Sequence, residues 1–346
     1  MKITYKKHTL NFKRPSGTSR GVLRTKETWF LILKEGNKTG IGECGILRGL
    51  SIDDRPDYED TLKWVCVNMH LGAHKLYNAL NEFPSIQMGV ETAFLSLKAK
   101  NPFEIFPSSY TNGKASIPIN GLVWMGDKEF MNSQIKEKIA LGFKCIKMKI
   151  GAIDFETEME LLKSIRKEFS ANEIELRVDA NGAFSPEEAL EKLKRLSDLQ
   201  LHSIEQPIKA GQWEAMAKLC EQTPLPIALD EELIGVFDES NKKKLLQTIQ
   251  PQFIILKPSL IGGFRSSDTW IELAETQNCG WWITSALESN VGLNAIAQYT
   301  FTKNSNLPQG LGTGSLYTNN INAPLKVSKG QLMYQPESTW DVKLLD

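Results

Sequence analysis

Residues 144–151 read KCIKMKIG, and this stretch decides the fold of the 346-residue chain. Apart from its lysines and one glycine it is a short apolar run, typical of a buried β-strand. Side chains alternate along a strand, so Lys147 and Lys149 point to the same side. Two ammonium groups on one face of an apolar strand predict that this face borders a polar site. The other face is predicted to pack against a buried layer.

After residue 115, strands of this kind alternate with amphipathic helical stretches. The strands are predicted over 116–124, 144–151, 174–181, 201–208, 226–233, 253–261 and 280–287. Seven strand–helix units in a row predict parallel strands closed into a barrel, with an open doubly wound sheet as the alternative. The Gly-rich stretch GLGTGSL at 310–316 lacks the G-x-G-x-x-G spacing and a following helix, so it gives little support to a dinucleotide site.

The first third of the chain has a different pattern, typical of a small α+β unit. Its predicted elements are a hairpin over 28–34 and 40–46 and helices over 58–80 and 85–98. Residues 101–115 are rich in Pro, Ser, Asn and Gly and predict a linker. We therefore expect one domain over 1–110, onto which the tail 322–346 folds back, and a barrel domain over 111–321.

The composition argues against several classes of protein. The formal net charge is +0, with 41% hydrophobic and 24% charged residues, so nothing predicts nucleic acid or an anionic membrane as a partner. The apolar runs, such as WFLIL at 29–33, are too short to span a bilayer, and the first residues have no signal-peptide character. Five scattered cysteines form no C-x-x-C pair, which favours a reducing cytoplasm over a disulfide scaffold or zinc ribbon.

A charged or polar residue stands near the C-terminal end of six predicted strands. These residues are Lys149, Asp179, Glu205, Asp230, Lys257 and Ser285. Neighbours in this series are 25 to 30 residues apart, which is about the length of one strand–helix unit. We expect them to hold the same place on successive strands. Active sites of such barrels lie at the C-terminal ends of the strands, so the six residues predict a single site.

Three carboxylates in this series, those of Asp179, Glu205 and Asp230, would repel one another if they pointed at one buried place. A divalent cation between them resolves that conflict. Oxygen ligands without His or Cys suit Mg²⁺, or Mn²⁺, better than zinc. The alternative is that these acids only pair with Lys149, Lys257 and Arg177.

Six short motifs give the chain a resemblance to a known family. They are K-x-K at 147–149, D-A-N at 179–181, E-Q-P at 205–207, D-E at 230–231, K-P at 257–258 and S-x-x-E-S at 285–289. In this order they are similar to the enolase superfamily, muconate-lactonizing subgroup. The resemblance implies an α/β fold: a modified TIM-type (β/α)7β barrel with an α+β capping domain, formed by the N-terminal third and the C-terminal tail. It also implies Mg²⁺ held by Asp179, Glu205 and Asp230.

The resemblance further implies a Lys base that works with magnesium to stabilise an enediolate. Lys149 would remove a proton α to a carboxylate, and Lys257 would act as a cation on the opposite face of the substrate. A second ammonium disfavours the charged form of a lysine, so Lys147 would help to keep Lys149 neutral. The substrate-binding residues we expect are Lys147, Asn181, Ser285, Glu288 and Arg20. Residues 16–20 and 48–53 match two loops that close over the substrate in the family.

The substrate class follows from an absent motif. Dipeptide epimerases of the subgroup carry Asp-x-Asp near the last strand, whereas this chain reads GLGTGSLYTNN without an acid. The stretch resembles instead the branch that dehydrates 2-succinyl-6-hydroxy-2,4-cyclohexadiene-1-carboxylate to 2-succinylbenzoate in menaquinone biosynthesis.

N-succinyl amino acid racemase or dipeptide epimerase activity is the alternative. A non-catalytic carboxylate-binding barrel would have little reason to keep so costly a cluster of charges. We expect a small dicarboxylate partner, and homo-oligomerisation stays open.

Overall fold

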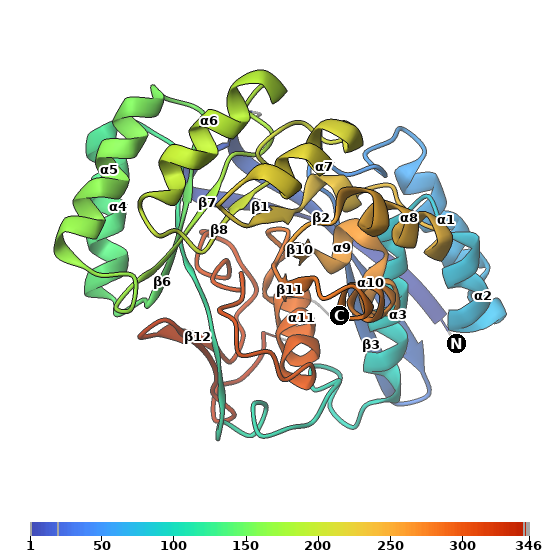
Figure 1. Cartoon of the computed structure of the whole chain (residues 1–346). Helices are drawn as coiled ribbons and strands as arrows, with labels where there is room; N and C mark the ends of the chain where they lie inside the picture. Colours follow the sequence, from blue (N-terminus) through green and yellow to red (C-terminus); the bar gives the residue numbers. More distant parts are fainter. Residues whose placement is uncertain (1, 19–20, 342, 344–346) are drawn as a thin grey trace.

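The barrel is the larger part of the structure, a computed structural model that describes residues 2–18, 21–341 and 343 (Figure 1). Its parallel strands are β5 (Gly121–Val123), β6 (Cys145–Lys149), β7 (Glu175–Asp179), β8 (Ser203–Glu205), β9 (Ile227–Leu229), β10 (Phe253–Leu256) and β11 (Gly280–Ile283). They lie side by side in chain order, without the reversal that a doubly wound sheet requires. The predicted barrel is therefore confirmed and its alternative excluded.

A short segment at residues 309–310 closes the barrel. Gln309 forms a parallel bridge with Ile119, and Gly310 forms one with Thr284. The amide of Asn120 donates to the Gln309 carbonyl oxygen at 3.0 Å, and the amide of Ser285 donates to that of Gly310 at 3.0 Å. This segment takes the eighth strand position, as the (β/α)7β architecture demands.

Helices surround the strands and cover their outer faces (Figure 1). They are α4 (Lys128–Ala140), α5 (Phe155–Glu168), α6 (Pro186–Ser197), α7 (Trp213–Gln222), α8 (Glu239–Ile249), α9 (Pro258–Ile261), α10 (Gly263–Thr276) and α11 (Asn290–Thr302), with a 3₁₀ turn, η2, at Glu231–Leu233. Met148 and Ile150 of the opening stretch are fully buried in the apolar cluster shared with these helices. Because side chains alternate, Lys147 and Lys149 face the barrel interior, as predicted.

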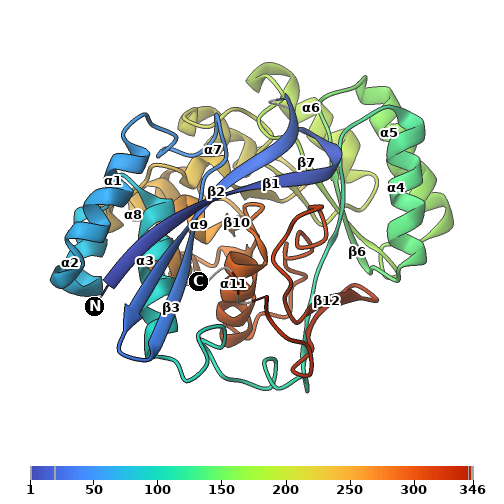
Figure 2. The same cartoon turned by 180° about the vertical axis from the view of Figure 1, so that it is seen from behind.

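The N-terminal unit is an antiparallel sheet that crosses one side of the barrel (Figure 2). Its elements are β1 (Lys2–Thr18), β2 (Gly21–Glu35), β3 (Lys38–Gly45), α1 (Tyr58–Val67), η1 (Met69–Leu71), α2 (Gly72–Ala79) and α3 (Pro84–Lys98). The predicted hairpin corresponds to β2 and β3, whereas β1 was not predicted, since its polar sequence becomes a strand only by pairing with β2. The single helix predicted over 58–80 is wrong: α1 ends at Val67, η1 follows, and α2 starts anew at Gly72, whose φ of 76° a continuous helix does not allow.

The strand predicted over 116–124 is also divided. Only β5 joins the barrel, while β4 (Ser116–Pro118) pairs with the C-terminal strand β13 (Gln331–Tyr334). β13 in turn pairs with β12 (Leu325–Ser328). The tail hairpin thus lies against β4, and after it Trp340 stacks on Phe103 with 4.1 Å between ring centroids. The domain limits 1–110, 111–321 and 322–346 remain predictions.

A buried carboxylate fastens the N-terminal sheet to the barrel. Glu43 of β3 accepts hydrogen bonds from the amides of Ser289 and Gly292, both at 2.8 Å. These amides belong to the first turn of α11, where donors have no partner within the helix. Thr28 Oγ1 donates to the same carboxylate at 2.8 Å, and Glu43 is 3% exposed.

We expect Glu43→Ala to lower the free energy of unfolding by about 3 kcal/mol, because several buried donors lose a charged acceptor. Urea unfolding followed by circular dichroism measures this. The matched control is Glu35→Ala on the same sheet, where the side chain is exposed and the change should stay within about 0.5 kcal/mol. Equal effects of the two substitutions would contradict the fastening role.

Candidate active site

The two lysines of β6 share one carboxylate at the mouth of the barrel. Asp179 Oδ2 lies 2.8 Å from Lys149 Nζ and 3.0 Å from Lys147 Nζ. Lys147 also forms an ion pair with Glu205, and Lys149 donates to Asn181 Oδ1 at 2.7 Å. All these side chains come from the C-terminal ends of neighbouring strands β6, β7 and β8 or from the residues just after them, so the predicted convergence is real.

Lys257 approaches the same acids from the other side of the barrel. Its ammonium pairs with Asp230 and lies 3.8 Å from Glu205 Oε1. Glu205 therefore stands between Lys147 and Lys257, with Asp179 and Asp230 as flanking acids. Arg177, the third cation of the alternative in which the acids only form ion pairs, pairs with Glu175 instead and lies over the Trp282 ring at 4.3 Å, so it takes no part in the cluster.

The expectation that these residues hold the same place on each strand needs a correction. Lys149, Asp179 and Glu205 are paired across the sheet, but Glu205 pairs onward with Ala228 and not with Asp230. The register shifts further along the sheet, because strands of a closed barrel are tilted and staggered. On the later strands, a residue at the mouth of the barrel therefore lies further toward the C-terminal end than the cross-strand pairing alone indicates.

Burial and mutual repulsion govern the protonation of the cluster. Burial, followed by the carboxylates of Asp179 and Asp230, raises the pKa of Glu205 to about 8, although Lys147 opposes this. Burial would also raise the pKa of Asp179, but the three lysines hold it well below its usual range. For Lys257, burial is outweighed by Asp230 and Glu205, which raise its pKa. Of Asp179 and Glu205, Glu205 is thus the acid whose negative charge the lysines compensate less.

The donor set fits a hard divalent cation. Asp179, Glu205 and Asp230 offer carboxylate oxygens, which Mg²⁺ and Mn²⁺ prefer. Glu205 Oε1 is buried and has no hydrogen-bond partner. Within residues 2–18, 21–341 and 343, no three acidic, His or Cys side chains are arranged around one point as ligands. Each of these carboxylates forms an ion pair with a lysine, which a bound cation would have to replace.

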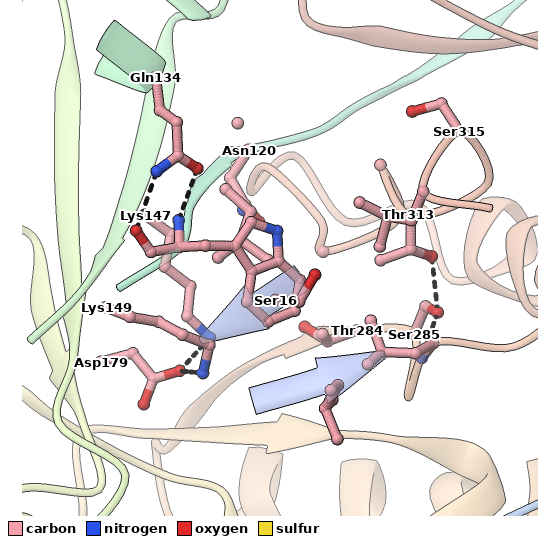
Figure 3. A pocket seen from close by; sticks show the side chains of 18 of the residues that line it. Ser16, Asn120, Gln134, Lys147, Lys149, Asp179, Thr284, Ser285, Thr313 and Ser315 are labelled. Atoms are coloured by element: carbon pink, nitrogen blue, oxygen red, sulfur yellow. Dashed lines mark hydrogen bonds and ion pairs between the residues drawn. The ribbon is translucent and has the colours of Figure 1, made fainter. Parts of the chain in front are cut away.

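A cavity of about 350 Å³ opens above the cluster (Figure 3). Lys147, Lys149, Asp179, Asn181 and Lys257 lie at its charged end. Its apolar wall combines Leu122 and Trp124 of the barrel with residues of the N-terminal unit, which are Leu23, Leu47 and Leu50. This volume suits a small organic molecule with a charged end and an apolar body.

The predicted substrate-binding residues occupy different places. Lys147, Asn181 and Ser285 line the cavity. Glu288 lies behind Ser285, whose hydroxyl donates to Glu288 Oε2 at 2.6 Å, and a second hydroxyl, that of Ser259, donates to Oε1. Glu288 is not among the residues that line the cavity. Arg20 falls outside the described residues, so its role stays a prediction.

Ser285 is held by a complete set of hydrogen bonds. Besides donating to Glu288, its Oγ accepts from Thr313 Oγ1 at 2.8 Å and from the amide of Leu287 at 3.0 Å. Leu287 has φ 63°, a left-handed conformation that is strained for a bulky residue. Asn181 and Gln206, just after Asp179 and Glu205, share this conformation with φ 45° and 38°. Such strain recurs where a backbone turns functional groups into a site.

Sequence reasoning missed Gln134 on α4. Its side chain accepts from the amide of Trp124 at 2.9 Å and donates to the carbonyl oxygen of the same residue at 3.0 Å (Figure 3). These bonds hold the wall of the cavity just after β5 ends. The available signal was a glutamine on the buried face of α4, beside Met131 and Ile135.

Comparison with known proteins agrees with this geometry. Residues 131–337 match the model of the enolase C-terminal domain-like family. The chain belongs to this family. It is 46% identical to the o-succinylbenzoate synthase of Desulfotalea psychrophila, over 96% of this chain and 98% of that protein.

Solved structures of relatives share the enolase-type fold. The crystal structure of MenC from Desulfotalea psychrophila matches with a TM-score of 0.86 and 42% identity, covering 96% of this chain and 99% of that one. A dipeptide epimerase from Enterococcus faecalis, described as complexed with Mg and a dipeptide, matches with a TM-score of 0.82 at 18% identity over 96% of both chains. The predicted superfamily and fold class are thereby confirmed. In the described part of the chain no helix could span a membrane.

We expect Glu288→Ala to lower kcat/KM by roughly tenfold, since two buried hydroxyls lose a charged acceptor and the turn at Leu287 loosens. Glu288→Gln keeps the volume and one acceptor, so its loss should be smaller. Steady-state kinetics on both variants, with the thermal midpoint recorded alongside, checks this order. Unchanged kcat/KM in the alanine variant would show that the turn does not depend on Glu288.

Proposed function

We propose that the chain is an o-succinylbenzoate synthase, a carbon–oxygen lyase that converts 2-succinyl-6-hydroxy-2,4-cyclohexadiene-1-carboxylate to 2-succinylbenzoate by syn-dehydration in menaquinone biosynthesis. The observation that carries the proposal is the pair Lys149 and Lys257 on opposite sides of three buried acids, at one end of a cavity of about 350 Å³. The 46% identity to the Desulfotalea psychrophila synthase over nearly the full length of both proteins supports it.

The cofactor we propose is Mg²⁺, or Mn²⁺ in its place, held by Asp179, Glu205 and Asp230. When bound, it would neutralise the charge that develops on the substrate carboxylate as the α-proton leaves. These three acids share their charge with Lys147, Lys149 and Lys257 in the present arrangement. Metal binding would release the lysine side chains from the acids, so that they can face the substrate.

Lys149 is the proposed acid and base. It removes the α-proton as a neutral amine and then returns that proton to the departing hydroxyl on the same face, which makes the elimination syn. Asn181 Oδ1, 2.7 Å from Lys149 Nζ, orients the amine. Lys147, which shares the Asp179 carboxylate with Lys149, adds a second positive charge beside it. Gain of aromaticity makes loss of the hydroxyl easy once the enediolate exists.

Lys257 is proposed as the electrostatic partner across the substrate ring. Its raised pKa keeps it an ammonium at neutral pH, so it stabilises the enediolate without exchanging a proton. Ser285 and Lys147 are the groups we propose for the carboxylate end, because both line the cavity. Arg20 for the succinyl carboxylate, a cytoplasmic location and the oligomeric state remain predictions.

The racemase or epimerase alternative has less support. Residues 310–316 contribute Gly, Thr, Ser and Leu residues to the cavity wall. They offer no acid for an α-ammonium group. A panel of the cyclohexadiene dicarboxylate, N-succinyl amino acids and dipeptides, compared by kcat/KM, separates the reactions. Preference for a dipeptide would overturn the proposal.

Substitution of either lysine should abolish dehydration. We expect Lys149→Ala and Lys257→Ala each to lower kcat by at least about 100-fold, the usual range for loss of general acid–base or electrostatic catalysis. Lys144→Ala is the matched control, since Lys144 is exposed at the start of the same stretch. Circular dichroism confirms folding. Turnover close to that of the unmodified enzyme in either alanine variant would refute the two-lysine mechanism.

Removal of the divalent cation should stop the reaction reversibly. We expect chelation with EDTA to abolish turnover and added Mg²⁺ to restore it, and Glu205→Gln to weaken Mg²⁺ activation. Titration of activity against Mg²⁺ concentration measures both effects. Full activity after exhaustive chelation would exclude the proposed metal.

A further inference from the structure

A second cavity lies between the two units, away from the proposed active site. It has a volume of about 140 Å³ and is bounded by α2 and α3 of the N-terminal unit and by α8 and α10 of the barrel. The side chains used below are Lys242 of α8, Arg265 and Ser266 of α10, and Gln87 of α3, all of which line it. None of them belongs to the site described above.

Lys242 is the unusual residue of this cavity. It is 3% exposed, yet its ammonium forms no ion pair with a carboxylate of the described residues. Its one hydrogen bond goes to a neutral group, Ser266 Oγ, at 2.5 Å, and the Trp270 ring lies 5.4 Å away. An ammonium has three donors, so a buried one with a single neutral acceptor is poorly compensated.

The surroundings of Lys242 add positive charge and hydrogen-bond donors. Arg265 stacks over the Tyr77 ring at 5.1 Å, and its backbone amide donates to the carboxylate of Glu91 at 3.1 Å. The Gln87 amide lies close by, donating to the Tyr77 carbonyl oxygen at 2.9 Å. Glu239 also lines the cavity, and the carboxylate of Asp238 also acts on Lys242. Both acids are exposed to solvent, which screens their charge, whereas Lys242 is buried.

We propose that this cavity binds a phosphate group, with Lys242 and Arg265 as its cationic ligands. A tetrahedral oxyanion would give the buried ammonium the charged acceptor that Ser266 cannot supply, and Arg265 could contact it from the solvent side. Because the cavity joins both units, a bound anion would also hold α3 against α10. The proposal is independent of the reaction assigned to the barrel mouth.

Burial supports this reading of Lys242. It lowers the pKa of the Lys242 ammonium to about 8, although Glu239 and Asp238 oppose the shift. The charged form is therefore disfavoured where it stands, and an anion in contact with it would restore that form. Stabilisation of the charged form of Lys242 by a bound anion would contribute binding free energy that other lysines do not supply.

The experiment is calorimetric titration of the whole chain with inorganic phosphate in a phosphate- and sulfate-free buffer. We expect one saturable site, weakened about tenfold or more by Lys242→Met and also weakened by Arg265→Gln. Lys243→Met, an exposed neighbour on α8, should bind as the unmodified chain does. Lys149→Ala should retain the site, which separates it from anion binding at the barrel mouth.

Thermal unfolding provides a second readout. Met is close to Lys in volume and removes a buried charge, so Lys242→Met should fold and be no less stable in the absence of phosphate. Phosphate should raise the midpoint of the unmodified chain and of Lys243→Met, but not that of Lys242→Met.

A titration with glycerol 1-phosphate identifies the source of the group: tighter binding than inorganic phosphate assigns a phosphorylated metabolite, and equal or weaker binding assigns the free ion. Unchanged phosphate affinity in Lys242→Met, or absence of a saturable site in the unmodified chain, overturns the proposal.

Discussion

Three neighbouring carboxylates buried inside a barrel are the constraint on which the rest of this structure depends. Asp179, Glu205 and Asp230 are almost completely buried, so each needs a cation within contact distance. Lysines from the opposite sides of the barrel supply that charge. The same repulsion that makes the cluster costly for stability makes it a place where a divalent cation and a developing negative charge can be stabilised.

The N-terminal unit turns this cluster into an enclosed site. Leu23, Leu47 and Leu50 cover the mouth that the barrel strands leave open. Glu43 holds the same sheet against α11, one residue after the segment that places Ser285 and Glu288. The N-terminal unit and the active-site residues are therefore connected through the first turn of α11. A displacement of the N-terminal sheet would change the geometry of the site.

Much of the fold and site could be predicted from sequence. Period-two alternation placed Lys147 and Lys149 inward, and regular spacing brought the acids to one edge, because both follow from local backbone geometry. The hydrogen bonds that support the residues of the cavity wall could not be predicted in this way. Gln134 on Trp124 and Thr313 on Ser285 connect residues from different elements, and no local periodicity links them.

The sequence by itself determined the parallel barrel, the inward residues and the charges at the strand ends, since each depends on alternation and on the length of a strand–helix unit. Only the tertiary structure decided that Asp230 and Lys257 lie further along their strands than pairing alone suggests, because stagger is a property of the closed sheet. It also decided that β4 leaves the barrel to pair with the tail, and that Glu288 supports Ser285 from behind. The pairing of β4 and the position of Glu288 depend on which residues from distant parts of the chain are available as hydrogen-bond partners.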